Sequence, residues 1–134
     1  ADPTKKMSKS DENPNATVTV LDDRDTIMRK FKRAVTDSGR EVRRGEGKEG
    51  IENLMSIYGA VTEKTFEGKG YGDFKAAVGE AVADSLMPMR EEYKKITADK
   101  AYLERCMKEG AEKAFAASRR TLRKVNKKVG FIDL

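Results

Sequence analysis

Apolar residues recur with the period of an α-helix over the last third of the chain. With the small polar Ser118 at one position, their spacing is three or four residues at every step, at Leu103, Met107, Ala111, Ala114, Ser118, Leu122, Val125 and Val129. Because residues three and four apart share one face of a helix, this stripe predicts a long helix from about residue 99 to 129. Gly130 is its expected stop. We interpret the stripe as a buried face, with Cys106 also in the core and Phe131, Ile132 and Leu134 folding back onto it.

Three earlier stretches show the same period and predict helices over about residues 22–35, 51–61 and 71–96. Asp22 and Asp23 are candidate caps for the first. Its inner face holds Ile27, Met28, Phe31, Ala34 and Val35. The second inner face holds Ile51, Leu54, Met55, Tyr58 and Val61. The third holds Phe74, Val78, Ala81, Val82, Leu86, Met89, Tyr93 and Ile96.

The stretches between the predicted helices are polar or short. Residues 1–15 and 40–50 read as loops, and the β-branched residues 17–21 form either a short strand or an extended connector. The expected fold class is therefore all-α. It is a helical bundle of about four helices, preceded by a basic loop and a short extended segment.

The composition excludes several kinds of chemistry. The chain has no histidine and one cysteine, so a Ser-His or Cys-His nucleophile is excluded, as are metal sites built on histidine or on several cysteines. We expect no metal site. No apolar run approaches the roughly 20 residues of a membrane-spanning helix, and the first residues lack the apolar centre of a secretory signal. A cytoplasmic protein without a membrane partner is expected.

The positive charge is concentrated near the end of the chain. The net charge is +5, whereas residues 94–128 alone hold twelve Lys or Arg and four Asp or Glu, a net +8. Such asymmetry suggests a polyanionic partner. A solvated helix face would carry the same charges, so the charge alone leaves both interpretations open.

The segment Lys6-Met7-Ser8-Lys9-Ser10 matches the KMSKS signature of class I aminoacyl-tRNA synthetases. Further blocks resemble tryptophanyl-tRNA synthetases of bacterial type and keep their order, at residues 11–14, 31–38, 50–54, 66–75, 110–114 and 129–131. The resemblance spans nearly the whole chain. It is similar to the C-terminal part of that family, with a KMSKS loop and connector at residues 1–21 and a helical anticodon-binding domain at residues 22–134.

The resemblance implies roles for particular side chains. Lys6 and Lys9 would be catalytic and contact the phosphates of Mg²⁺-bound ATP, with Met7, Ser8 and Ser10 completing the ATP-binding loop. Cations on long stems suit this task because they can follow the charge that builds on the leaving phosphates. The tRNA-binding candidates are Arg119, Arg120, Arg123, Lys124, Lys127 and Lys128. Candidates for stacking on anticodon bases are Tyr58, Phe66, Tyr71, Tyr93 and Tyr102.

The chain also departs from the family. The nucleotide-binding fold, the HIGH-type motif and the tryptophan pocket precede KMSKS in the family, and none of them is in this sequence. The implied parent is a homodimer that activates tryptophan with ATP and transfers it to its tRNA. The chain by itself is expected to be an inactive monomer that does not retain ATP, with no DNA partner.

Three alternatives remain at this stage. The chain could be the equivalent part of a tyrosyl-type synthetase, although the residues after KMSKS favour the tryptophan branch. It could be a non-catalytic basic helical module that binds RNA or protein. It could also be an interaction bundle with no RNA partner, which would show no salt-dependent binding to tRNA.

Overall fold

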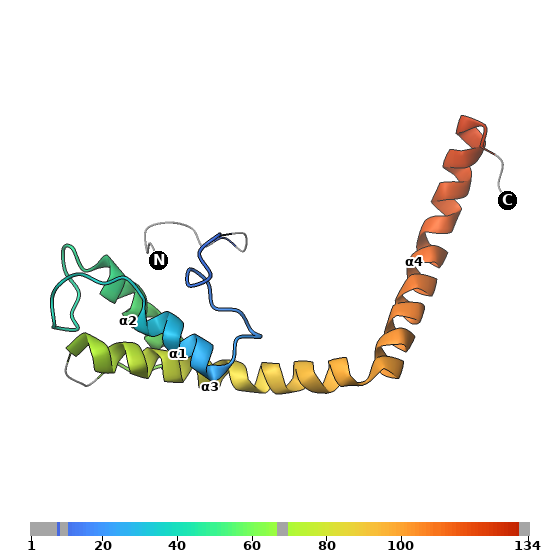
Figure 1. Cartoon of the computed structure of the whole chain (residues 1–134). Coiled ribbons are helices and arrows are strands. Elements are labelled where there is room, and N and C mark those ends of the chain that lie inside the picture. The colour runs from blue at the N-terminus through green and yellow to red at the C-terminus, as the bar shows by residue number, and fades with distance from the viewer. Residues whose placement is uncertain (1–7, 9–10, 67–69, 132–134) are drawn as a thin grey trace. The chain divides into compact units, whose positions relative to one another are not determined.

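The computed structural model describes residues 8, 11–66 and 70–131. They form four helices, α1 (Arg24–Lys32), α2 (Glu49–Thr62), α3 (Gly70–Ala98) and α4 (Lys100–Val129) (Figure 1). No strand occurs in these ranges, and residues 17–21 form a connector that ends in a turn. The all-α prediction is therefore confirmed. The chain divides into two compact units, Ala1–Glu91 and Glu92–Leu134, with the boundary inside α3.

The helix ends follow the capping residues of the sequence. The Asp23 side chain accepts a hydrogen bond from the Thr26 amide at 2.8 Å, and the Asp99 side chain accepts one from the Tyr102 amide at 2.9 Å. Gly130 ends α4 in the left-handed conformation, as predicted. The first helix is shorter than predicted, because it ends at Lys32 and leaves Val35 outside it and 61% exposed.

The core of the first unit is built by α1, α2 and the first half of α3, which lie side by side (Figure 1). Its buried side chains are Ile27, Phe31, Ile51, Leu54, Phe74, Val78, Val82 and Ala83. All but Ala83 lie on the predicted inner faces. A ring cluster extends this core, with Phe66 4.8 Å from Phe74 and 6.1 Å from Tyr58 between ring centroids.

The second half of α3 contradicts the predicted core. Met89, Tyr93 and Ile96 continue the apolar stripe, yet all three side chains are exposed. Helix length gives the reason. At 1.5 Å per residue, α1 and α2 span roughly 14 and 21 Å, whereas α3 spans roughly 44 Å. The shorter helices can cover only part of the face that α3 offers.

The prediction that the stripe of α4 is buried is also wrong in this structure. α4 has no buried residue, and Met107, Phe115, Leu122, Val125 and Val129 are all exposed. Cys106 is exposed as well, and so is Phe131, at 70%. Ile132 and Leu134, expected to fold back, lie outside the described residues. The periodicity identified the helix correctly but not its burial.

The loop between α1 and α2 is held by a half-buried polar cluster. Lys48 Nζ lies 2.9 Å from Asp37 Oδ1 and donates to the Tyr71 hydroxyl at 2.6 Å. The Tyr71 hydroxyl donates to Asp37 at 2.8 Å, and the Gly39 amide does so at 2.6 Å. The hydrogen bond from Lys48, followed by those from Tyr71 and Gly39, outweighs desolvation and lowers the pKa of Asp37 to about 2. The cluster joins the loop to the first turn of α3.

Gly50 marks a close approach of the same loop to α2. A Cβ atom at this position would overlap the carbonyl oxygen of Val35 and lie 3.1 Å from the Cα of Thr36. Both contacts are to backbone, so no side-chain rotation relieves them. Gly59, in the same helix, has open space where its Cβ would lie. The two glycines therefore form a matched pair.

Gly50→Ala is expected to lower the free energy of unfolding by about 1–3 kcal/mol, because overpacking against fixed backbone forces the chain apart. Gly59→Ala should raise it by roughly 0.5–1 kcal/mol, because alanine loses less entropy in a helix interior. Urea denaturation followed by helical circular dichroism measures both. Equal effects of the two substitutions would contradict the close approach.

Asp37→Asn should destabilise the protein in a pH-dependent way. The folded-state pKa lies below the unfolded value of 3.8, so the stabilisation is complete above about pH 4 and disappears as the pH falls towards 2. The stability gap between wild type and variant should therefore be wide at pH 7 and narrow at pH 2.5. Urea midpoints at both pH values test this, with the exposed Glu46→Gln as the control for loss of a carboxylate from the same loop. A gap of equal width at both pH values would contradict it.

Candidate nucleic-acid interface

The KMSKS segment is only partly described by the structure. Ser8 is exposed, and its backbone carbonyl accepts a hydrogen bond from the Asp11 amide at 3.3 Å. Lys6, Met7, Lys9 and Ser10 lie outside the described residues. Their roles therefore stay predictions.

The connector after this segment is attached to the helices through Asp22. The amide and hydroxyl of Thr19 each donate to its carboxylate at 3.0 Å, and Lys30 Nζ lies 2.5 Å from it. Arg90 of α3 donates to the Asp22 backbone carbonyl. Partial burial alone would raise the pKa of Asp22, but the hydrogen bonds from Lys30 and Thr19 outweigh it, and the pKa is lowered. Asp22 is thus the attachment point of the connector rather than a helix cap.

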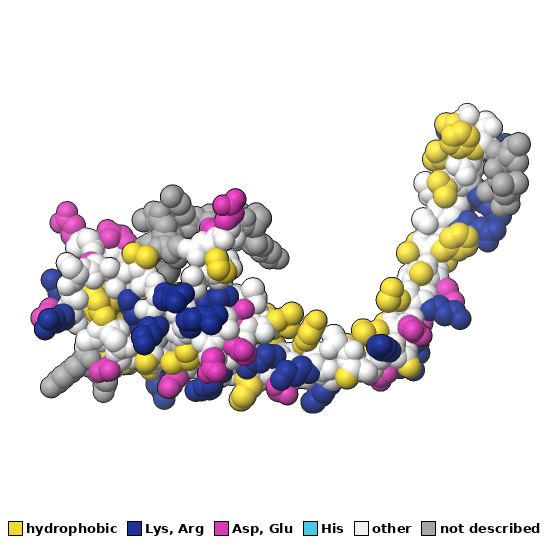
Figure 2. Space-filling model, in the orientation of Figure 1, with side chains coloured by type: hydrophobic (Ala, Val, Ile, Leu, Met, Phe, Trp, Pro, Cys, Tyr) yellow, Lys and Arg dark blue, Asp and Glu magenta, His cyan; other side chains and the backbone are white. Residues whose placement is uncertain are grey.

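The six predicted tRNA-binding residues lie together on the polar side of α4. Arg119, Arg123 and Lys127 form one row at four-residue spacing, and Arg120, Lys124 and Lys128 form the neighbouring row. All six are exposed. In Figure 2 the yellow apolar side chains follow one edge of α4 and dark-blue cations follow the other. We call these six residues the basic face of α4.

The basic face contains no acidic residue of its own. Between Glu112 and Asp133 the sequence has no Asp or Glu, so all the charged side chains of this part of α4 are cations. Lys127 and Lys128 also lie in the last turn, where the helix dipole favours positive charge. The helix dipole therefore explains the presence of two of the six cations, and no ligand is needed to explain them. The other four lie further from the helix end and gain less from the dipole.

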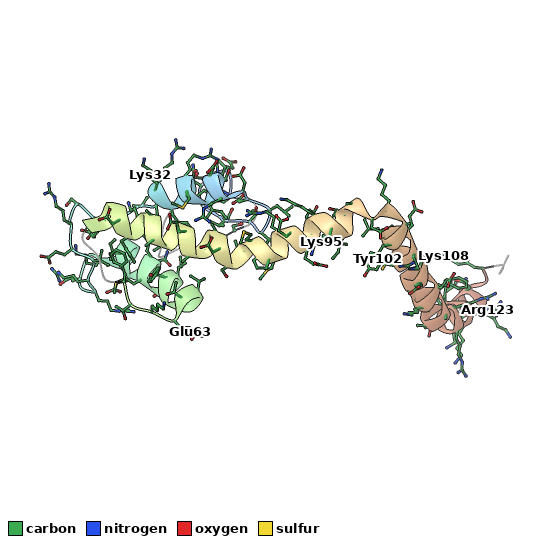
Figure 3. The ribbon with its side chains drawn as sticks, turned by 90° about the horizontal axis from the view of Figure 1, so that it is seen from below. Lys32, Glu63, Lys95, Tyr102, Lys108 and Arg123 are labelled. Atoms are coloured by element: carbon green, nitrogen blue, oxygen red, sulfur yellow. The ribbon has the colours of Figure 1, made fainter. Side chains whose placement is uncertain are left out.

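The structure divides the five candidate stacking residues into three that are engaged in the fold and two that are exposed. The rings of Tyr58 and Phe66 pack on each other and on Phe74, and the Tyr71 hydroxyl is engaged by Asp37. Those three side chains therefore serve the fold. Tyr93 and Tyr102 are exposed and remain candidates (Figure 3 labels Tyr102 on α4).

Phe115 is a further candidate that the sequence interpretation missed. It is 59% exposed, and the Arg119 guanidinium lies 5.2 Å from its ring centroid. Arg105 lies 5.6 Å from the ring of Tyr102 in the same way. Each pair presents an aromatic surface beside a cation, the combination that single-stranded nucleic acids require. The i, i+4 spacing of Phe115 and Arg119 was the signal available in the sequence.

Two further kinds of site were sought in the part of the chain that the structure describes. No group of three or more His, Cys, Asp or Glu residues there could hold a metal ion. None of the helices in the same ranges combines the length and the apolar character that crossing a membrane requires.

Comparison with known families identifies the group to which the sequence is related. The family model described as "tRNA synthetases class I (W and Y)" matches residues 1–86. The chain belongs to this family. The match covers the KMSKS segment, the connector, α1, α2 and the first half of α3, and it confirms the resemblance noted from the motifs.

Individual relatives extend the similarity to α4. The proteins named tryptophan–tRNA ligase from Wolinella succinogenes and Clostridium perfringens are 45% and 44% identical over 138 aligned positions. Each alignment covers 98% of this chain and 42% of the relative. The crystal structure of tryptophanyl-tRNA synthetase from Mycoplasma pneumoniae aligns with a TM-score of 0.69 and 27% identity, over 98% of this chain and 44% of that one. The chain thus spans less than half the length of these relatives.

Proposed function

We propose that this chain acts as the C-terminal part of a tryptophan–tRNA ligase. The family match alone does not separate tryptophan from tyrosine enzymes. The observation that carries the proposal is the 45% identity to a tryptophan–tRNA ligase along 98% of the chain, with a second such relative at 44%. The complete enzyme would activate tryptophan with ATP and transfer it to its tRNA in the cytoplasm.

The KMSKS segment would act on the phosphates of ATP. Lys6 and Lys9 would neutralise charge on the leaving phosphates, Ser8 and Ser10 would donate hydrogen bonds, and Met7 would anchor the segment by packing. The chemistry of these donors fits a polyphosphate, and Mg²⁺ would arrive bound to the ATP. The Asp22 attachment gives the segment a fixed base on α1 and α3.

The helices at residues 22–134 would bind the tRNA. The basic face of α4 offers phosphate contacts, which position RNA without reading its sequence. Tyr93, Tyr102 and Phe115 offer exposed rings for bases that are splayed out of the anticodon loop. The complete enzyme would be a homodimer. This chain by itself would be a monomer.

The isolated chain should not catalyse the first step. A phosphate-binding segment without the fold that positions ATP can contribute no transition-state geometry. We expect no tryptophan-dependent exchange of pyrophosphate into ATP. We also expect an ATP dissociation constant weaker than about 1 mM, equivalent to a binding free energy of about 4 kcal/mol or less. Exchange assays and isothermal titration measure these quantities, and millimolar or tighter binding would contradict the proposal.

Binding of tRNA is the main test of the proposed function. The chain is titrated against fluorescent tryptophan tRNA with its CCA anticodon and against the same tRNA with a changed anticodon, each at two salt concentrations. We expect tighter binding to the CCA anticodon at both salts. Equal binding that weakens together with salt would instead indicate a non-specific basic module.

Variants of the basic face refine this test. Substituting the row Arg120, Lys124 and Lys128 by Gln should lower the slope of log K against log salt by about two to three, because each lost phosphate contact releases about one counterion fewer. A control triple, Lys64→Gln, Lys95→Gln and Lys100→Gln, removes the same charge from exposed positions outside the basic face. An equal slope change in the control would contradict a role for the basic face.

A further inference from the structure

A second basic stretch lies in the first unit, far from α4 in sequence. Residues 29–48 hold eight Lys or Arg and three Asp or Glu, a net +5. Outside this stretch and residues 94–128, the chain has a net charge of −8. Figure 2 shows dark-blue side chains gathered over α1, where this stretch begins. The largest excesses of positive over negative charge thus lie in these two stretches.

Part of this charge has a structural explanation. Lys30 and Lys48 form the ion pairs with Asp22 and Asp37. Arg29 and Lys32 lie in the last turn of α1, where cations complement the helix dipole. No such explanation applies to the three arginines of the loop that follows. These are Arg40, Arg43 and Arg44, which we call the arginine loop.

The arginines point into solvent from the loop. All three are exposed, and Arg43 contacts Glu41 at 3.2 Å with both side chains more than 60% exposed. An ion pair so open to solvent contributes little to stability. Arg40 and Arg44 make no ion pair within residues 8, 11–66 and 70–131. Three guanidinium groups within five residues repel one another, so the fold gains nothing from this arrangement.

The loop that carries them is nevertheless fixed at several points. On its N-terminal side, Lys75 Nζ donates to the Ala34 carbonyl at 2.8 Å, and the Asp37–Lys48–Tyr71 cluster follows. In the middle, Val42 packs against the core between Arg40 and Arg43. On the C-terminal side, the Gly45 amide donates to Glu52 of α2 at 2.9 Å. The arginines therefore extend from a backbone that is already ordered.

A pre-ordered cluster of cations is what tight binding of a polyanion needs. Ordering a loop on binding subtracts from affinity, and here that ordering is completed by folding. Guanidinium groups suit phosphates because their planar fork donates two parallel hydrogen bonds to one phosphate. Between Arg40 and Arg44 the one apolar residue is Val42, which packs against the core, so this part of the loop offers no apolar side chain for insertion into a lipid surface. The ligand chemistry is therefore that of a sugar–phosphate backbone.

We propose that Arg40, Arg43 and Arg44 form a second phosphate-binding site, which contacts the backbone of the bound RNA in addition to the basic face of α4. This proposal rests on the RNA partner of the proposed function. In this proposal the arginine loop contributes affinity and orients the RNA, but it does not read bases. Its effect should therefore be the same for tRNAs that differ only in the anticodon.

The test is a salt titration of the full chain with the two tRNAs used above. The variant Arg40→Gln, Arg43→Gln and Arg44→Gln should bind at least about tenfold more weakly near 0.1 M salt, with a slope lowered by about two to three. The control triple, Lys64→Gln, Lys95→Gln and Lys100→Gln, should bind much as the wild type does. Both triples lose three positive charges, so a general charge effect cancels.

A fourth variant separates the ordering of the loop from its charge. Tyr71→Phe removes the hydroxyl between Asp37 and Lys48 and leaves every arginine in place. It should weaken binding less than the arginine triple does, and the salt slope should stay that of the wild type, because the number of phosphate contacts is unchanged. A Tyr71→Phe slope reduced as far as that of the arginine triple would count against the proposal.

The outcomes distinguish this proposal from the function on which it rests. The second site is overturned if the arginine triple binds tRNA with the affinity and salt slope of the wild type. It is also overturned if the control triple loses as much affinity as the arginine triple does. The second site is also overturned if the arginine triple loses binding to vesicles of phosphatidylserine and phosphatidylcholine while its binding to RNA is unchanged. If the wild type prefers the CCA anticodon and the arginine triple binds as the wild type does, the proposed function is supported and the second site is not. Equal binding to both tRNAs together with a weakened arginine triple supports the second site and removes the anticodon specificity.

Discussion

Burial of Phe74 is the interaction on which the first unit depends. This ring is fully buried near the start of α3, with Ile27 of α1 and Ile51 of α2 equally inaccessible in the same cluster. Each of the three helices is amphipathic and cannot bury its apolar face alone. Their shared contact also fixes the helix ends that the intervening segments must connect. The polar clusters of the unit act on segments that this core has already placed.

Two half-buried carboxylates then attach the two segments that carry basic residues to the packed helices. Asp22 draws the N-terminal connector onto α1 and α3, and Asp37 draws the loop after α1 onto the start of α3. Both carboxylates have lowered pKa values because their hydrogen bonds favour the ionised form more than burial disfavours it. The two segments that these aspartates hold are the one that carries KMSKS and the one that carries the arginine loop. The same electrostatic device thus serves both segments.

The second unit follows a different principle. Its stripe repeats every eleven residues, as in Leu103, Ala114 and Val125, and a period of 3.67 residues keeps the stripe on one side of a nearly straight helix. No residue of α4 is buried, so within this unit the stripe and the basic face are both exposed. Six cations in a part of α4 that has no acidic residue in its sequence then create a local positive potential. This potential and the exposed rings of Tyr102 and Phe115 support the RNA contact that we propose for α4.

The sequence by itself determined the helices, their caps and their amphipathic faces, because these depend on residues close together in the chain. Asp23 and Gly130 act where their local patterns predicted, and the motifs near the N-terminus led to the correct family. Tertiary structure alone decided which apolar faces are buried, since periodicity describes one helix and burial needs a second element. For that reason Cys106 and Met89 were expected in the core and are exposed. The pairing of Asp37 with Lys48 and Tyr71 could not be predicted from the sequence either. Lys48 is 11 residues and Tyr71 is 34 residues from Asp37, and only the fold brings them together.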